Sequence, residues 1–394
     1  MRVVRICLVV LLALACVACI SRKAIDGLLA REEIREALAK PAEAPPASLV
    51  VCGRVPVVHL YGTPREMGTQ YGQLLGRALR ALHRAMDAFV SQEAKERMLQ
   101  LARRRERALP QEVREELKAV AKASGMPYDE LVALNVTSRL ACSALAVWGR
   151  ARGRGGDPNT AGLIMGRNAD YFSMGFSDRG MLLVVRHPRE GVPVASVNFL
   201  GMVGAFTGIN AHGVCFGNML VFNAAGSQQN NDGLTIQLAM RLAAQRSRTA
   251  KDMAKLLTAQ KHAIPMNVMI ADPNEAQVLE LGLRKVQVRR SRDGILAASN
   301  YFLTPRLRTK QSRCRRYDSL LAAARKHRGQ MTVEKMTEAL YEARVQGLNL
   351  QAVVFEPTAM RMHVSINHMP AAKGPYVQFD LKKLFAQPPS ADKD

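Results

Sequence analysis

The pattern of the chain changes near residue 141, and this change constrains the fold more than any other feature. Between residues 64 and 136, apolar residues recur at the spacing of amphipathic helices. Beyond residue 141 the chain shows short apolar runs of strand type, separated by turn residues and interrupted by paired helical segments. Antiparallel strands beside paired helices indicate an α+β protein. Two sheets packed face to face, with helices outside, are one layering that fits.

The helical part opens with a clear start signal. A strand is expected over Val55–Tyr61. Thr63-Pro64-Arg65-Glu66 then supplies a capping threonine, a proline at the first helical position and a glutamate three residues after the cap. Further helices are expected at 92–108, 110–124 and 128–136.

The second part opens on a predicted β-hairpin. The segments Leu140–Gly149 and Leu163–Tyr171 are short apolar runs joined by a Gly-rich turn, with Cys142 near the start and charged residues at the end. Ser291-Arg292-Asp293-Gly294 predicts the turn of another hairpin. Other strands are expected at 181–186, 194–199, 205–209, 214–216, 268–271, 278–281, 286–289, 295–298, 350–355, 362–366 and 376–379, and helices at 235–245, 250–260, 315–326 and 333–345.

Composition excludes several classes of protein. The chain has 394 residues, 48% of them hydrophobic, which is ample for a core and excludes disordered and coiled-coil proteins. Its net charge of +23 favours an anionic surface such as nucleic acid or phospholipid, although an arginine-rich proteome explains the charge equally well. Zinc-finger spacing is missing and aromatic residues make up only 5% of the chain. We therefore expect no nucleic-acid partner and keep an anionic membrane surface as a candidate partner.

The N-terminus predicts export. Arg2 and Arg5 precede an apolar run, Ile6–Ile20, that is too short to span a membrane comfortably, so residues 1–18 are interpreted as an export signal. Ala18 before Cys19 resembles a bacterial lipoprotein box, which makes Cys19 a candidate lipidation site. We expect an exported protein of the bacterial cell envelope, lipid-anchored if Cys19 is modified. The expected organisation is a signal (1–18), a tether or linker (19–50), a helical region (51–141) and a catalytic region (142–394).

Several classes of enzyme are excluded because their sequence motifs are missing. The chain contains no phosphate-binding loop, dinucleotide fingerprint, zinc-protease motif or serine-hydrolase elbow. His363 and His368 are poorly spaced as a metal pair, so we expect no metal and no cofactor. Cys142 is a candidate nucleophile, but a cysteine at the head of a strand can equally be a small apolar residue of the core. Disulfides among Cys52, Cys215 and Cys314 stay open.

Several motifs occur in the order found in one known family. They are Thr63–Gly68, Glu130–Asn135, the start at Cys142, Gly166–Tyr171, Gly208–Gly213, Ser299–Phe302 and Ser312–Arg315. Together they resemble the autoproteolytic acyltransferase family typified by acyl-coenzyme A:6-aminopenicillanic-acid acyltransferase, which is related to choloylglycine hydrolase. The resemblance implies a four-layer αββα sandwich of the N-terminal-nucleophile (Ntn) hydrolase type, preceded by a helical pro-region.

The resemblance also implies a self-activating thiol. The precursor would be cut between Ala141 and Cys142, leaving two fragments of the same chain in association. The new α-amine, with an ordinary pKa of about 8, would then act as the base for its own thiol. Alanine stands at position 141 where glycine is common in the family.

Five further residues match catalytic positions of the family. Arg167 would bias the thiol towards thiolate and Asp170 would hold the α-ammonium group. Asn300 matches an asparagine that donates to the oxyanion, and Asn218 matches a second donor at a different spacing from Gly213. The late arginine is one of Arg313, Arg315 and Arg316, and the S-x-x-R spacing favours Arg315.

Two classes of function follow. The first is a cysteine amidohydrolase or acyltransferase that splits the C–N amide bond of a small, non-protein acyl amide substrate through an S-acyl-Cys142 intermediate. The second is a non-catalytic envelope lipoprotein that uses the same fold as a binding module. The second class requires neither cleavage nor a reactive thiol.

Overall fold

A computed structural model describes residues 22–136, 141–153, 162–173, 175–221, 229–307 and 314–386. The expected signal, Cys19 and Arg313 lie outside these residues. The α-helices are α2 (Arg22–Leu38), α3 (Pro64–Phe89), α4 (Gln92–Glu106), α5 (Gln111–Ser124), α6 (Tyr128–Val136), α7 (Ile236–Ala244), α8 (Ala250–Thr258), α9 (Arg315–Lys326), α10 (Val333–Ala343) and α11 (Leu381–Phe385). None of these helices is both long and apolar enough to cross a membrane.

The strands form two sheets. The larger has the order β1 (Ala42–Ala44), β2 (Ala47–Cys52), β3 (Val55–Gly62), β6 (Met181–Pro188), β7 (Val194–Phe199), β8 (Thr207–Asn210), β9 (Cys215–Leu220), β10 (Met266–Ala271), β11 (Ala276–Leu281) and β12 (Val286–Arg290). The smaller has the order β13 (Ile295–Ala298), β4 (Ala141–Val147), β5 (Ile164–Asp170), β14 (Asn349–Glu356), β15 (Arg361–Ile366) and β16 (Val377–Asp380). Neighbouring strands are antiparallel except for β3 and β6, which are parallel.

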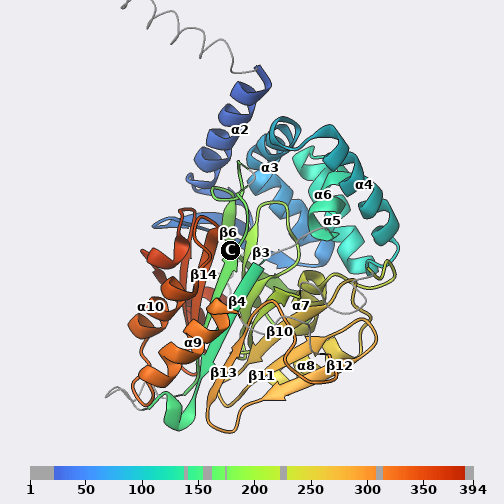
Figure 1. Cartoon of the computed structure of the whole chain (residues 1–394). Helices are drawn as coiled ribbons and strands as arrows, with labels where there is room; N and C mark the ends of the chain where they lie inside the picture. The colour runs from blue at the N-terminus through green and yellow to red at the C-terminus, as the bar shows by residue number, and fades with distance from the viewer. Residues whose placement is uncertain are drawn as a thin grey trace, which may run out of the picture.

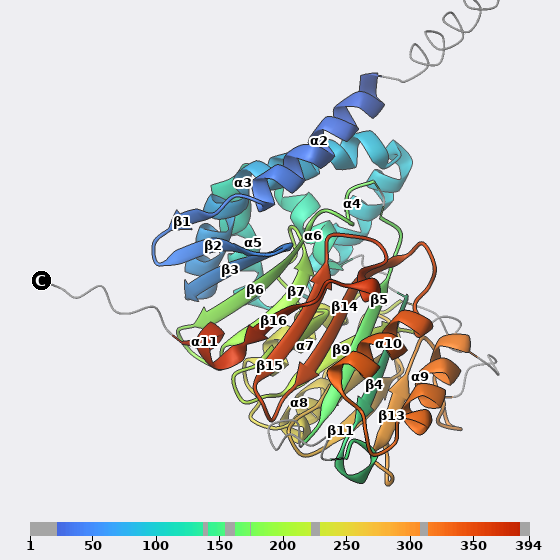
Figure 2. The same cartoon turned by 90° about the vertical axis from the view of Figure 1, so that its left-hand side faces the viewer.

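The elements stack in four layers (Figure 1, Figure 2). One buried apolar cluster joins α2, α3 and α5–α8 to the outer face of the larger sheet. A second cluster fills the space between the two sheets, and a third joins the smaller sheet to α9 and α10. The predicted α+β class and the αββα sandwich with its preceding helical region are therefore confirmed.

Local signals account for the start of the helical region. The N–H of Glu66 donates to Thr63 Oγ1 (3.3 Å) and the N–H of Thr63 donates to Glu66 Oε2 (2.7 Å), which completes the capping box expected from the sequence. Helix α5 ends at Gly125, whose φ of +76° lies in the left-handed region that glycine tolerates.

The expectation of a tether at 19–50 is wrong for its described part. Ala30, Ile34 and Leu38 of α2 recur every fourth residue and are buried against the helical layer. The Pro/Ala-rich segment that follows forms the β1–β2 hairpin, and Leu49 belongs to the same apolar cluster. The buried stripe of α2 therefore outweighs the linker-like composition.

The expected hairpin at 291–294 is also wrong. Strand β12 is the edge of the larger sheet, whereas β13 is the edge of the smaller one. Gly294 O accepts a hydrogen bond from the N–H of Trp148 (2.9 Å), and Ile295 pairs with Val147. The turn therefore transfers the chain from one sheet to the other.

A buried ion cluster ties the helical region to the larger sheet. Glu116 of α5 pairs with Arg186 of β6 (Nη2–Oε1, 3.3 Å) and with Arg241 of α7, and all three side chains are at most 2% exposed. The cluster joins residues on both sides of the Ala141–Cys142 bond. Removal of one partner from a buried ion cluster leaves an uncompensated charge in a medium of low polarity.

We expect Glu116→Gln to lower the free energy of unfolding by about 3–5 kcal/mol, because Arg186 and Arg241 lose their shared carboxylate. Glu112→Gln on the same helix is the matched control. Glu112 pairs with Arg246 at the surface, so that change is expected to cost about 1 kcal/mol or less. Urea unfolding of both variants measures the difference, and equal losses would contradict the structural role of the cluster.

Candidate active site

Cys142 lies at the head of β4, in the middle of the four layers. The predicted pairing of this strand with β5 is confirmed, with Cys142 opposite Ala169 and Ala141 opposite Asp170. The Cys142 side chain is fully buried in the cluster between the two sheets. The thiol therefore belongs to the inner face of the smaller sheet.

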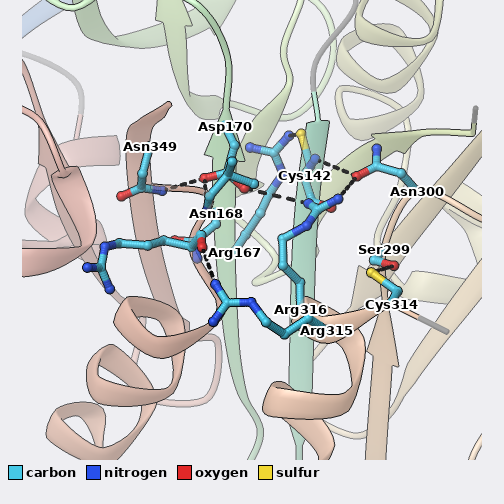
Figure 3. Close-up of polar contacts among 12 residues, drawn as sticks. Cys142, Arg167, Asn168, Asp170, Ser299, Asn300, Cys314, Arg315, Arg316 and Asn349 are labelled. Carbon is cyan, nitrogen blue, oxygen red and sulfur yellow. Dashed lines mark hydrogen bonds and ion pairs between the residues drawn. The ribbon is translucent and has the colours of Figure 1, made fainter. Parts of the chain in front are cut away.

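Arg167 approaches the thiol from the same face. Side chains of a strand alternate between its two faces, so Arg167 and Ala169 of β5 both point into the space between the sheets. The Nη2 group of Arg167 donates to Cys142 Sγ (3.1 Å) and to Asn218 O (2.9 Å). The predicted pairing of Arg167 with the thiol is thus present in the structure (Figure 3).

Asp170 lies on the opposite face of β5, because it is an odd number of residues from Arg167. Its Oδ1 accepts hydrogen bonds from Asn349 Nδ2 (3.0 Å) and from the N–H of Val345 (3.3 Å). Its Oδ2 lies 3.6 Å from Arg316 Nη1. The two charged side chains therefore flank the start of β4 from opposite sides of the sheet.

Asn300 reaches Cys142 through the pairing of β13 with β4. Ala298 is opposite Ala144, so the chain that follows β13 runs beside the first residues of β4. Asn300 Oδ1 accepts hydrogen bonds from the N–H of Cys142 (3.0 Å) and from Arg316 Nη2 (2.6 Å). Its Nδ2 donates to Leu220 O (2.5 Å). Asn300 thus acts as an acceptor towards Cys142 in this structure, and its expected role as oxyanion donor stays a prediction.

Of the two candidate late arginines that the structure describes, Arg316 lies at the site, and Arg315, which the spacing favours, points away from it. Arg316 Nη1 donates to Cys142 O (2.8 Å), whereas Arg315 Nη2 donates to Arg344 O (3.4 Å) at the surface. Figure 3 shows the two side chains diverging from the start of α9. Adjacent residues of a helix differ by about 100° in direction, so a shift of one residue decides which side chain faces the thiol.

Asn218 lies beside Arg167 rather than directly at the thiol. Its main-chain oxygen and its Oδ1 (3.5 Å) both face Arg167 Nη2, and its Nδ2 lies 3.8 Å from Met266 Sδ. The contact that the structure gives to Asn218 is therefore a hydrogen bond that holds Arg167. Its expected role as a second oxyanion donor stays a prediction.

Burial dominates the electrostatics of the site. It raises the pKa of the Cys142 thiol above its ordinary value, although Arg167, Arg316 and the main-chain N–H of Asp170 act to lower it. Burial also raises the pKa of Asp170, against the hydrogen bond from Asn349 and the charge of Arg316. The thiol therefore keeps its proton near neutral pH and requires a base before it can act as a nucleophile.

Sequence reasoning missed two neutral residues that contact Arg167. Its Nη1 donates to Thr207 Oγ1 and to Gln351 Oε1 (2.8 Å). Both residues lie within strands that the sequence predicts, but neither belongs to a motif or carries a charge. The position of Arg167 also requires glycine at residue 217, because a Cβ there would lie 2.6 Å from Arg167 Nε.

The question of disulfides is answered for the described cysteines. Cys52, Cys142, Cys215 and Cys314 are all free thiols.

Within the described residues one group, His83, Asp87 and Glu130, gathers three side chains of the kind that ligate metals. Lys95 Nζ pairs with Glu130 (2.7 Å) and with Asp87, so a lysine already supplies the cation that these carboxylates require.

The layers and the site together define a class of protein. An αββα sandwich with a thiol at the head of an inner strand is the architecture of Ntn hydrolases. A family model for acyl-coenzyme A:6-aminopenicillanic acid acyl-transferase matches residues 157–365, more than half of the chain. The chain belongs to this family, as its motifs predict. The matched segment contains Arg167, Asp170, Asn300 and Arg316 and begins after Cys142.

The individual proteins to which this chain is similar share little sequence identity with it. An uncharacterised protein of Archaeoglobus fulgidus is 21% identical over 342 residues, which cover 72% of this chain and 57% of that protein. The chain thus spans little more than half the length of that relative.

Among solved structures, similarity extends to a Caenorhabditis elegans ortholog of N-acylethanolamine-hydrolyzing acid amidase (15% identity, TM-score 0.44, 55% of this chain and 93% of that one). A mutant of the conjugated bile acid hydrolase of Clostridium perfringens is 11% identical, with a TM-score of 0.45, and the match covers 63% of this chain and 95% of that one. Penicillin V acylase of Agrobacterium tumefaciens is 10% identical, with a TM-score of 0.43, and the match covers 62% of this chain and 87% of that one.

We expect the Cys142 thiol to ionise only as the pH rises through a pKa above its ordinary value, and Arg167→Met to raise that pKa further. The substitution removes the positive charge next to Sγ, while the raising effect of Asp170 remains. The ultraviolet absorbance of the thiolate measures ionisation, after subtraction of the curve of Cys142→Ser. Arg315→Met is the control and should leave the curve unchanged. A curve for Arg167→Met at or below that of the unmodified protein would contradict the assignment.

Proposed function

We propose that the chain is a cysteine Ntn amidohydrolase or acyltransferase that cleaves its own Ala141–Cys142 bond and then acts on the amide bond of a small acyl amide. One observation carries this proposal. The side chain and the main chain of Cys142 are held at the same time, by Arg167 at Sγ (3.1 Å), Asn300 at N (3.0 Å) and Arg316 at O (2.8 Å). Any buried residue needs partners for its main-chain N–H and C=O, but a cysteine that served only as a core residue would not require a buried guanidinium at its sulfur. Family membership supports the same class of chemistry.

Self-cleavage is the first step of the proposal. The Cys142 thiol attacks the carbonyl carbon of Ala141 and its proton passes to the peptide nitrogen. The C–N bond then breaks, this nitrogen becomes the amine of Cys142, and the acyl group remains on sulfur. Water then hydrolyses the thioester and leaves a free carboxylate on Ala141. Arg316 and Asn300 fix the backbone of Cys142 and so hold the thiol close to the peptide that it attacks.

The amine released in this step supplies the missing base. Its ordinary pKa of about 8 is close to neutrality, and it belongs to the same residue as the thiol. Asn300 Oδ1 already accepts a hydrogen bond from this nitrogen. Asp170 is paired with Ala141, and its Oδ2, which lies 3.6 Å from Arg316 Nη1, accepts no hydrogen bond from the described residues; both observations support a role in accepting one from the ammonium form.

The second step repeats this chemistry on a substrate. The thiol loses its proton to the α-amine and attacks the amide carbonyl, and the amine of the substrate leaves with that proton. The acyl group then remains on Cys142 until water or another amine removes it. Arg167 stabilises the sulfur while it carries negative charge.

We expect the purified protein to contain two chains, the second beginning at Cys142 and ending at Asp394. Cys142→Ala should remain a single chain, because the attacking sulfur is gone. Cys215→Ala is the matched control, since Cys215 is an equally buried thiol between the sheets, and this variant should be cleaved normally. Intact mass and N-terminal sequencing measure the result. A single uncut chain with an unreactive Cys142 would favour the binding-module alternative.

We expect Arg316→Gln to slow the release of amine by about a hundredfold, because the backbone of Cys142 loses one of its two fixed contacts. Arg315→Gln should leave the rate within about twofold, because Arg315 is exposed and donates to Arg344 O at the surface, away from Cys142. Rates are measured on the processed protein with N-acyl amino acids, penicillins and conjugated bile acids. Equal effects of the two substitutions would refute the assignment of Arg316.

A further inference from the structure

Arg167 differs from the buried Arg152, Arg186 and Arg241 in what neutralises it. Arg152 pairs with Glu356 (2.8 Å), and Arg186 and Arg241 share Glu116. Arg167 is fully buried, yet the described part of the chain places no carboxylate in an ion pair with it, and the charge of Asp170 acts on it only from beyond ion-pair distance. Burial of a cation without a counter-ion is costly, so the neutral surroundings of Arg167 require an explanation.

Two neutral side chains take the place of a carboxylate. Thr207 lies on β8 of the larger sheet and Gln351 lies on β14 of the smaller one. Gln351 Oε1 accepts from Arg167 Nη1 (2.8 Å) and from Thr207 Oγ1 (2.5 Å), and Arg167 Nη1 also donates to Thr207 Oγ1. Gln351 Nε2 donates to Val197 O (3.4 Å), so the orientation of the amide is fixed by donors on one side and an acceptor on the other.

The shape of the larger sheet also restricts Arg167. A Cβ at Gly217 would collide with Cδ and Nε of Arg167, so the aliphatic part of the arginine crosses β9 at the one place where a side chain is missing. The main-chain oxygen of Asn218 then accepts from Nη2, the same nitrogen that contacts Cys142 Sγ. The guanidinium is therefore held by hydrogen bonds and by packing.

We propose that Thr207 and Gln351 are positioning residues that hold Arg167 against Cys142 without adding a negative charge to it, so that the developing thiolate is the anion in direct contact with the guanidinium. The inference rests on the proposed function and specifies how that site stabilises its nucleophile. A glutamate has nearly the same shape as Gln351 and would pair with Arg167 more strongly, while it would give up only the long hydrogen bond from Nε2 to Val197 O (3.4 Å). A purely structural role would therefore be served better by glutamate, whereas the proposed role requires glutamine.

Gln351→Glu separates these two roles. The new carboxylate lies within hydrogen-bond distance of Arg167, which keeps it ionised. We expect the melting temperature to be maintained or raised, while the pKa of the Cys142 thiol rises by about one unit or more, a tenfold loss of thiolate at a given pH. Amine release should fall to the same extent and its pH profile should move to higher pH. A purely structural Gln351 predicts unchanged ionisation of the thiol.

Thr207 provides a second and independent test. Thr207→Val keeps the shape of the side chain but removes the hydroxyl that Arg167 and Gln351 share, so we expect a higher thiol pKa and a lower rate. Thr207→Ser retains the hydroxyl and should behave as the unmodified protein does. If Gln351→Glu does not fold, the comparison of valine with serine decides the question.

Ionisation is followed by thiolate absorbance on the full chain, after subtraction of the Cys142→Ser curve in each background. Identical curves for the unmodified protein, Gln351→Glu and Thr207→Val would overturn the inference even if the protein is an active enzyme. Shifted curves in a protein that neither cleaves itself nor releases amine would instead overturn the proposed function and leave the positioning role intact.

Discussion

The pairing of β4 with β5 is the constraint on which the rest of the site depends. It places Ala141 opposite Asp170 and Cys142 opposite Ala169, so the peptide bond between the first two residues of β4 lies against the charged end of β5. Because side chains alternate along a strand, Arg167 reaches the sulfur from between the sheets and Asp170 approaches the same peptide from the helical side. A shift of one residue in this register would exchange the two faces and separate both charges from their targets.

A second pairing brings in residues that are distant in sequence. Strand β13 lies beside β4 because the turn at 291–294 carries the chain from the larger sheet to the smaller one. Asn300 and Arg316 follow this strand and converge on the nitrogen and oxygen of Cys142. The larger sheet supplies Thr207 and Asn218, so the position of Arg167 depends on the fixed spacing of both sheets. Close packing of the apolar cluster between them keeps that spacing.

The sequence predicted those features that local chemistry determines. The capping box at Thr63 and the pairing of the strand at Cys142 with the strand that ends at Asp170 are local signals, and the structure confirms them. The family that the motifs predicted is confirmed by the family model. The sheet change at 291–294 was not predictable, because turn residues do not specify which strand the chain joins next. Arg316 was confused with Arg315 because spacing alone does not give the direction of a helical side chain. Thr207 and Gln351 were missed because neutral residues on ordinary strands carry no motif.

The orientation of the Asn300 side-chain amide indicates which group of Cys142 it holds. Its Oδ1 faces two N–H donors and its Nδ2 faces a carbonyl oxygen, so the opposite orientation of the amide would place donor against donor and acceptor against acceptor. An acceptor in contact with the nitrogen of Cys142 is suited to hold an α-amine, since an N–H directed at Asn300 leaves the nitrogen lone pair free to face another group. In the reaction that we propose, an uncharged amide holds the amine, an arginine without an ion-paired carboxylate holds the thiol, and the proton passes between two atoms of one residue. The charge separation that this proposed transfer creates would be stabilised on the sulfur side by Arg167 and on the nitrogen side by Asp170.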